Sequence, residues 1–400
     1  VQPPDGNHLE ESGGDGGMKW EKVKLGNVCE ITSSKRIFYS EYVDDGVPFY
    51  RSKEIIESDE GKVIENPLYI SVDKYNEIKE KFGVPQIGDM LLTSVGTIGI
   101  PYIIKKKDCF YFKDGNLTWF RDFREDLNSK YLYYWIKSSE GTGILYNATI
   151  GSSQKALTIS ALKNIKVSLP PRSVQDKIVE VVSAYDDLIE NNQKQIKLLE
   201  EAAQRLYKEW FVDLRFPGHE NTKIVDGVPE GWSRTNINEI LTFHRGYDLT
   251  KNEMKAGRYP VVGSTTVIGY HNEFKIKGPG IVTGRSGSLG KYQFIWDNFW
   301  PHNTSLYISD YKDHNIFFVY SLLQTVDFAS LNNGGAIPTL NRNVLSNIEV
   351  IEPTDELQEM FAKIAEPQYQ KIKNLEKQND RLKTVRDLLL PKFMSGEVEV

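Results

Sequence analysis

Residues 90–99 read Met-Leu-Leu-Thr-Ser-Val-Gly-Thr-Ile-Gly, and residues 281–290 repeat them as Ile-Val-Thr-Gly-Arg-Ser-Gly-Ser-Leu-Gly. In both stretches an apolar run leads into a glycine-containing segment, and two glycines occupy matching places. This pattern is typical of a β-strand that ends in a turn. The chain therefore contains one structural unit twice, here at an offset of 191 residues.

Four further matches keep the same order along the chain, and their offset falls from 212 to 183 residues. Five ordered matches are very unlikely by chance, so we interpret the sequence as a duplicated module whose second copy has shorter loops. The further matches are Trp20, Leu25 and Ile31 with Trp232, Ile237 and Phe243; residues 47–52 with 259–264; Asn116 with Asn303; and residues 162–167 with 345–350.

Each copy begins with a β-rich part that contains one predicted helix. The helices are predicted over 130–137 and 316–323. Short runs of β-forming residues, separated by glycine turns, predict the strands. These runs are 63–64, 68–70, 102–104, 281–283 and 306–308.

Each copy ends in a long helix. Pro170 and Pro171 open the first helix, and Pro353 followed by Thr354 opens the second. Apolar positions recur in alternating steps of three and four from Ile178 onward, a spacing that predicts a coiled coil. Polar residues occupy one equivalent position of this pattern in both helices, Gln195 in the first and Gln378 in the second. A proline at 367 predicts a kink, with the main second helix beginning near residue 369.

These features predict an α+β fold class. Two repeated, β-rich α/β domains are separated by two long helices that form an antiparallel coiled coil, with pseudo-twofold symmetry. The expected segments are 1–17, an added leader or tag before a native start at Met18; 18–170, the first domain; 171–215, the first spacer helix; 216–352, the second domain with its linker; and 353–400, the second spacer helix.

The composition is that of a globular protein, with 40% hydrophobic and 26% charged residues in 400. The net charge of −6 falls to −2 without the four acids of the leader, so any nucleic-acid partner requires a local basic surface. Cys29 and Cys109 are too few for a disulfide framework, and no apolar run reaches the roughly 20 residues of a membrane span. We therefore expect a cytoplasmic protein without a membrane partner.

Six short motifs, taken in order, resemble the specificity subunit of Type I restriction-modification systems. The resemblance covers 18–400, and the set is specific although each motif alone is modest. The motifs are Trp-Glu-Lys-Val-Lys-Leu-Gly at 20–26, Gly-Asp-Met-Leu-Leu-Thr at 88–93, Leu-Pro-Pro at 169–171 followed by Gln175, Trp-Phe-Val at 210–212, Gly-Val-Pro-Glu-Gly-Trp at 227–232, and Leu-Leu-Leu-Pro-Lys-Phe-Met-Ser-Gly at 388–396.

The resemblance implies a division of labour. The β-rich parts would be target recognition domains, each reading one half of a bipartite sequence in double-stranded DNA. The helices would set the spacer and dock two modification (adenine methyltransferase) subunits, and two restriction (translocase/endonuclease) subunits would complete the enzyme. S-adenosylmethionine would belong to the modification subunits and ATP with Mg to the restriction subunits, leaving no cofactor on this chain.

The residues agree with a non-catalytic role. An adenine methyltransferase needs an Asp/Asn-Pro-Pro-aromatic loop, and residues 66–69, Asn-Pro-Leu-Tyr, lack the second proline. Gly290 and Lys291 resemble the end of a phosphate-binding loop, but Arg285 replaces its first glycine and Tyr292 its Ser or Thr. The six histidines are scattered, so we expect neither catalytic residues nor a metal site.

DNA contacts are expected on loops at matching positions of the two copies. Bases are read by Arg, Lys, Asn and Gln, whereas phosphates accept hydrogen bonds from Lys, Ser, Thr and backbone amides. The candidates are Arg51, Ser52 and Lys53 with Gly263, Ser264 and Thr265; Ser94 and Thr97 with Arg285 and Ser286; Ser152, Ser153 and Gln154 with Gly335; and Lys113, Asn116, Lys291, His302 and Asn303.

Other interpretations remain open at this level. The glycine loops could be ordinary turns, and Asn116 and Asn303 could cap turns inside the fold. The whole chain could be a protein-interaction scaffold with no DNA role, in which two modules are held on a coiled coil. A self-sufficient nuclease or methyltransferase is disfavoured by the missing motifs.

Overall fold

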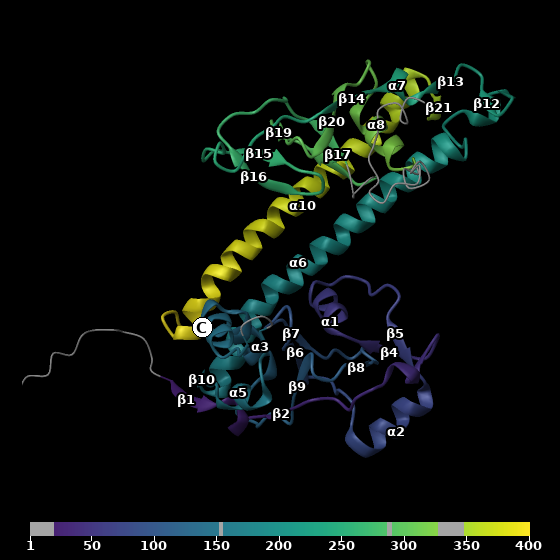
Figure 1. Ribbon diagram of the computed structural model, residues 1–400. Helices are drawn as coiled ribbons and strands as arrows, with labels where there is room; N and C mark the ends of the chain where they lie inside the picture. Colours follow the sequence, from purple (N-terminus) through teal and green to yellow (C-terminus); the bar gives the residue numbers. More distant parts are fainter. Residues whose placement is uncertain (1–19, 152–154, 286–289, 327–347) are drawn as a thin grey trace, which may run out of the picture. The chain divides into compact units, whose positions relative to one another are not determined.

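The computed structural model describes residues 20–151, 155–285, 290–326 and 348–400. They form two compact units (Figure 1). Unit 1 comprises residues up to 191 together with 378–400, and unit 2 comprises 192–377. The boundaries fall within the two long helices, so each unit contains part of both.

Unit 1 contains two four-stranded sheets and one strand pair among its described residues. Neighbours in the first sheet are antiparallel, and in the second sheet β4 and β8 run parallel. The first sheet is β2 (Glu30–Thr32), β9 (Leu117–Arg121), β6 (Met90–Thr93) and β7 (Pro101–Ile103); the second is β3 (Tyr42–Val43), β5 (Leu68–Ile70), β4 (Val47–Tyr50) and β8 (Tyr111–Phe112); β1 (Glu21–Lys24) pairs with β10 (Lys166–Leu169).

Unit 2 repeats this plan. Its larger sheet is again antiparallel, and β15 and β19 form a parallel pair in the smaller sheet. The larger sheet is β14 (Thr242–Arg245), β20 (Ser305–Asp310), β17 (Gly280–Gly284) and β18 (Tyr292–Ile295); the smaller is β16 (Val267–His271), β15 (Tyr259–Val262) and β19 (Trp300–Pro301); β13 (Ser233–Asn236) pairs with β21 (Glu349–Glu352), and β11 (Ile224–Val225) with β12 (Val228–Pro229).

The core follows the alternation of side chains along the central strands. In β6, Met90 packs with the helices of unit 1, whereas Leu91 packs between the two sheets. In β17, Ile281 and Val282 divide in the same way. Since successive strand residues face opposite sides, both copies bury one sheet between helices and a second sheet. The predicted duplication and α+β class are confirmed.

The strand register corrects one sequence match. Leu91 lies opposite Trp119, and Val282 lies opposite Tyr307, so β9 and β20 correspond at an offset of 188 rather than 187. A shift of one residue would turn every side chain of a strand to the other face. Asn116 therefore corresponds to Thr304, and its predicted match with Asn303 is wrong.

The predicted helices over 130–137 and 316–323 are confirmed as α3 (Ser129–Lys137) and α8 (Ile316–Leu323). Unit 1 has additional helices, so the expectation of one helix in each β-rich part is wrong. The run at 63–64 is a loop, and Val63 is exposed. The additional helices are α1 (Ser52–Asp59), α2 (Val72–Phe82), α4 (Ser139–Asn147) and α5 (Ile159–Asn164); unit 2 also contains the short α7 (Ile237–Ile240).

The long helices are α6 (Arg172–Tyr207), which continues into a π-helical turn over Lys208–Val212, and α10 (Asp355–Ser395). Within unit 1, Ile178 of α6 shares a core with Phe393 of α10, and Asp186 pairs with Arg386. The contact positions rise along α6 as they fall along α10, so the helices pack antiparallel, as predicted. In unit 2, Tyr207 meets Phe361 in the same sense.

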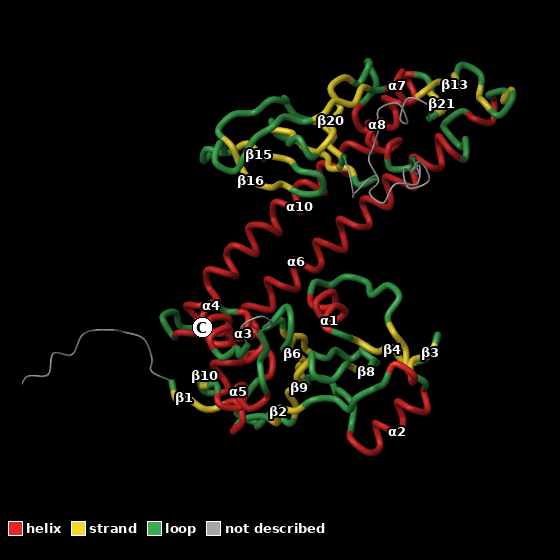
Figure 2. The backbone as a smooth tube through the Cα atoms, viewed as in Figure 1, coloured by secondary structure: helices red, strands yellow, loops and turns green. Residues whose placement is uncertain are grey.

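The predicted division at Pro367 into a short helix and a main helix from about residue 369 is wrong, because α10 runs continuously from Asp355 to Ser395 (Figure 2). An interior proline removes one helical hydrogen bond. Here Ala365 and Tyr369, on either side of it, are buried in the core of unit 2. Tertiary packing therefore holds the helix through the proline.

The start of each long helix is tied to its own unit by matching hydrogen bonds. In each unit a glutamine in the first turn of the long helix donates to the carbonyl of a proline that precedes the helix. The residue after this glutamine is acidic, and its carboxylate accepts from the asparagine that caps α3 in unit 1 or α8 in unit 2. These bonds are Gln175 Nε2 to Pro170 O (2.8 Å) with Gln358 Nε2 to Pro353 O (3.2 Å), and Asn128 Nδ2 to Asp176 Oδ1 (2.7 Å) with Asn315 Nδ2 to Glu359 Oε1 (3.0 Å).

Candidate nucleic-acid interface

The first pair of predicted loops follows the parallel strands. Because parallel strands end at the same edge of a sheet, the residues after β4 and β8 meet: Lys113 N donates to Tyr50 O at 2.9 Å. In unit 2, His302 N donates to Val262 O at the same distance, at the ends of β15 and β19. This edge therefore brings Arg51 close to Lys113 in the chain's first copy, and Gly263 close to His302 in the second.

The second pair of predicted turns joins the same edge. Ser94 N, after β6, donates to Asn116 O at 2.8 Å, and Arg285 N, after β17, donates to Thr304 O at 3.2 Å. Ser264 Oγ also donates to Thr304 O, at 2.7 Å. Turns that are far apart in sequence thus form one surface in each unit.

A shallow depression in unit 1 gathers four of the predicted residues: Ser52, Lys53, Thr97 and Asn116. Ala156 and Leu157 lie beside it, since Ala156 bridges to Val95 in its lining and Leu157 N donates to Ser94 O at 2.8 Å. Ser152, Ser153 and Gln154 themselves lie outside the described residues, as do Ser286 and Gly335.

Two expectations about the first copy need correction. Ser52 and Lys53 form the first turn of α1 and are not in a loop. The Glu54 carboxylate accepts from Arg51 N at 2.8 Å, and this contact caps the helix. Ser94 is 2% exposed and its hydroxyl lies 2.6 Å from that of Thr118, so in this conformation its side chain is committed to the core.

Charge pairing differs among the basic residues of unit 1. Arg51 forms a 2.6 Å ion pair with Glu54, whose side chain is 2% exposed. Burial acts to raise the pKa of Glu54, but the Arg51 side chain and backbone hydrogen bonds outweigh it and lower that pKa. Lys53 lies 3.7 Å from Glu57, whereas Lys113 has no ion pair within the described part of the chain.

The corresponding surface of unit 2 is held by side-chain hydrogen bonds. His302 Nδ1 lies 2.9 Å from Thr304 Oγ1, and Asn303 Nδ2 donates to Asp248. Gly263 is buried, and its carbonyl accepts from Gln293, whereas Thr265 and Lys291 are exposed. Arg285 is half-buried. The accessible polar groups of this surface are therefore mainly Thr265, Arg285 and Lys291.

Two basic residues on these surfaces were not predicted. Arg36 Nε lies 2.8 Å from Asp114, next to Lys113, and its side chain is 68% exposed. The Lys275 ammonium lies 4.7 Å from the Trp300 ring centre, beside β19. Lys35 and Arg36 form a basic dipeptide that could have drawn attention to Arg36, whereas Lys275 lies outside every matched segment and gives no sequence signal.

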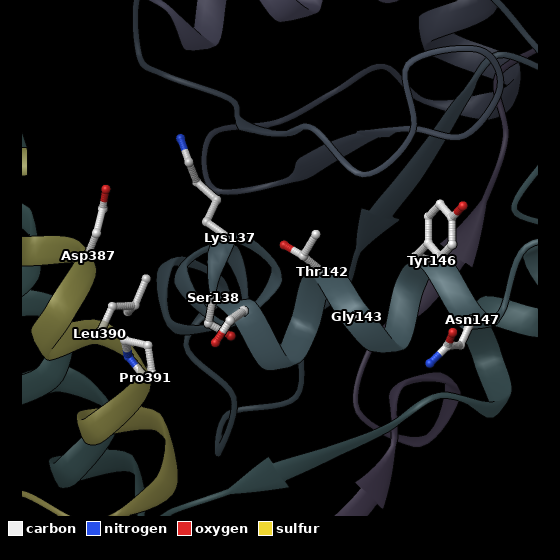
Figure 3. A pocket seen from close by; sticks show the side chains of 10 residues that line it. Lys137, Ser138, Thr142, Gly143, Tyr146, Asn147, Asp387, Leu390 and Pro391 are labelled. Carbon is white, nitrogen blue, oxygen red and sulfur yellow. The ribbon is translucent and has the colours of Figure 1, made fainter. Parts of the chain in front are cut away.

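Another depression of unit 1 lies between α4 and the last turns of α10 (Figure 3). Its lining is mixed: apolar groups such as Leu390 lie beside neutral polar side chains such as Thr142 and Asn147 and the acidic Asp387. Its one basic side chain is Lys137, which pairs with Asp59 at 2.9 Å. This chemistry does not match a phosphate backbone, so we do not include it in the interface.

Metal-binding clusters and membrane-spanning helices are both missing from the described residues. No group of three or more His, Cys, Asp or Glu side chains there could hold a metal ion. No helix among those residues has the length and apolar character needed to cross a membrane.

Known proteins are similar to this chain in sequence and in fold. The family model for the Type I restriction modification DNA specificity domain matches residues 18–201 and 229–384. The chain is 27% identical to the Type I restriction enzyme MjaIX specificity subunit of Methanocaldococcus jannaschii, over 95% of this chain and 94% of that protein. It is 30% identical to a putative type I restriction enzyme specificity subunit of Haemophilus influenzae, S.HindORF215P, over 46% of this chain and 45% of that one. The crystal structure of the S subunit of a Type I system from M. genitalium superposes with a TM-score of 0.61 at 18% identity, over 96% of this chain and 98% of its own, which shows a common fold.

Proposed function

The chain belongs to the Type I restriction-modification DNA specificity family, and we propose that each of its two units reads one half of a bipartite DNA sequence. The family membership accounts for DNA recognition as the general role of the chain. The two-part reading is our extension of it, supported by the duplicated surface. Long helices that contribute to both units would then set the number of unread base pairs between the half-sites.

One observation carries the proposal. The same two backbone hydrogen bonds gather the same turns in both units: Lys113 N to Tyr50 O with His302 N to Val262 O, and Ser94 N to Asn116 O with Arg285 N to Thr304 O. An equivalent surface that carries different side chains in each unit suits the reading of two different half-sites.

We further propose that this chain directs chemistry without performing it. Two modification subunits would dock on the helical part and methylate adenine with S-adenosylmethionine, and two restriction subunits would supply ATP-driven cleavage. The absence of a methyltransferase loop from the sequence supports this division, and the chain would need no cofactor of its own.

A base-resolution adenine methylome tests the proposal. Cells expressing this chain with the matching modification subunit should show a new bipartite motif with a fixed gap, methylated once on each strand; cells lacking the chain should not. Replacing residues 18–170 with those of a relative should change one half of the motif only. If the subunits assemble but methylation is unchanged from cells lacking the chain, DNA reading is refuted and the scaffold interpretation is favoured.

A further inference from the structure

In unit 1, the short turn η2 (Tyr39–Glu41) and its N-cap residue Phe38 present two adjacent aromatic side chains to solvent. Phe38 is 61% exposed and Tyr39 is 89% exposed. Aromatic rings contribute large apolar surfaces that are favourable to bury, so two neighbouring exposed rings on one turn mark a candidate binding surface. Neither residue belongs to the core clusters of unit 1.

The turn is held in a fixed conformation. The Glu41 carboxylate accepts from Phe38 N at 2.8 Å and forms a 3.0 Å ion pair with Lys74 of α2. The hydrogen bond from Phe38, with a smaller contribution from Lys74, lowers the pKa of Glu41, so this cap is charged at neutral pH. Tyr39 also meets Tyr42 edge-on, with ring centres 5.8 Å apart. The turn that carries the exposed rings is thus preorganised, which reduces the entropy lost on binding.

The turn adjoins the nucleic-acid interface. Arg36, two residues before Phe38, pairs with Asp114 in the turn that follows β8. Lys35 N donates to the hydroxyl of Tyr111 in the same strand, at 2.7 Å. Arg36 and Lys74 already form ion pairs with carboxylates. The contribution of this turn to the free energy of DNA binding would therefore come from stacking of its rings and not from its charge.

We propose that Phe38 and Tyr39 form an aromatic wedge that partly unstacks a base step of duplex DNA beside the half-site read by unit 1. The inference rests on the proposed function and adds to it a contact of a different chemistry. Apolar side chains inserted at a base step kink the duplex, and the energy of unstacking is recovered through a larger contact surface. At the constant offset of 212, the positions in unit 2 are Thr250 and Lys251, so the second half-site should remain stacked.

The test uses the complex with modification subunits and a duplex that carries the motif from the methylome. 2-Aminopurine, which brightens when it unstacks, replaces single bases across and beside each half-site in turn, except the adenines that are methylated, because a methyltransferase turns its target base out of the stack. The unchanged complex should raise fluorescence at one step beside the first half-site and at none within or beside the second. Phe38→Ala and Tyr39→Ala should abolish the signal and each weaken binding by roughly 5- to 150-fold, the range for loss of one stacking ring. Tyr39→Phe should retain both.

The matched control is Ile87→Ala, which also removes a highly exposed apolar side chain (69% exposed). Ile87 precedes the start of β6, whereas the turn of the nucleic-acid interface follows the end of that strand. This variant should change neither signal nor affinity. The salt dependence of binding should also be the same for Tyr39→Ala as for the unchanged complex, because stacking neutralises no phosphate.

Unchanged fluorescence and affinity in both alanine variants would overturn the wedge. Loss of subunit assembly with retained DNA binding would overturn it too, because the rings would then contact protein. If the unchanged complex fails to bind the duplex at all, the proposed function fails and the wedge falls with it, an outcome visible before any variant is made.

Discussion

Gln175 and Gln358 occupy matching places at the starts of α6 and α10, but their hydrogen bonding is unequal. Gln175 is fully buried and makes three bonds: Oε1 accepts from Asn128 N at 2.8 Å, and Nε2 donates to Asp126 O at 2.7 Å and Pro170 O at 2.8 Å. Among the described residues, Gln358 donates only to Pro353 O, at 3.2 Å, and its buried Oε1 accepts no bond.

Substitution by methionine, which keeps the length of the side chain but cannot donate, should therefore have unequal costs. In Gln175→Met, one N–H and two carbonyls lose their partner. At about 1–3 kcal/mol for each group left unpaired, reduced where water can reach, unit 1 loses about 3 kcal/mol. Gln358→Met loses one bond but also removes an unpaired acceptor, so we expect about 0–1 kcal/mol.

Native-state hydrogen exchange separates the two units. The amides of α3 report on the first joint and those of α8 on the second. A difference of about 2 kcal/mol corresponds to roughly thirtyfold faster local exchange in α3 of Gln175→Met than in α8 of Gln358→Met. Equal acceleration in the two variants would show that the unequal hydrogen bonds do not control how firmly each helix is anchored.

Three further predictions concern charge and reactivity. Lys113→Ala should reduce the slope of log K against log salt for DNA binding by about 0.9, because one phosphate contact is lost. The control Lys22→Ala, on β1, should leave the slope unchanged. Equal slopes for the two variants would exclude a phosphate contact at Lys113. Because Arg51 and backbone hydrogen bonds outweigh burial and lower the pKa of Glu54, its contribution to stability is present above the ordinary glutamate pKa of about 4.3 and is lost as pH falls through its lower folded value. Glu54→Gln should thus remove part of the acid sensitivity seen in urea unfolding, and an identical pH profile would contradict this. Burial raises the pKa of Cys29 to about 12, so iodoacetamide at pH 8 should label the exposed Cys109 first, as mass spectrometry of the native protein would show; faster labelling of Cys29 would refute its burial.

The repeat made the architecture predictable, and departures from the repeat explain what was missed. Between residues 52 and 90 the offset falls from 212 to 191, so most of the additional chain of the first copy lies in this interval. That segment forms α1 and α2. Local signals for both were present: Glu54 stands at the third position of α1, and Ser71 caps α2, which Gly83 ends. These signals were overlooked because the two copies were expected to contain the same helices and strands.

The site was only partly predictable, for a related reason. Residue type identified turns that do converge, because strand ends are readable from the sequence. Which side chains face outward depends on pairing across the sheet, as the burial of Ser94 against Thr118 shows. The offset of 188 between β9 and β20 likewise depends on their register with β6 and β17, which no local pattern determines.

The hydrogen bonds that gather the turns are made by the backbone, and this separates scaffold from surface. At the strand ends Lys113 in unit 1 corresponds to His302 in unit 2, and at the neighbouring turn Ser94 corresponds to Arg285. In each case the amide makes the same bond although the side chain differs. A side chain at such a position can therefore change without loss of the bond that places it. Two copies of one fold can in this way hold equivalent turns at equivalent places and still present different chemistry, which is what reading two unlike half-sites would require.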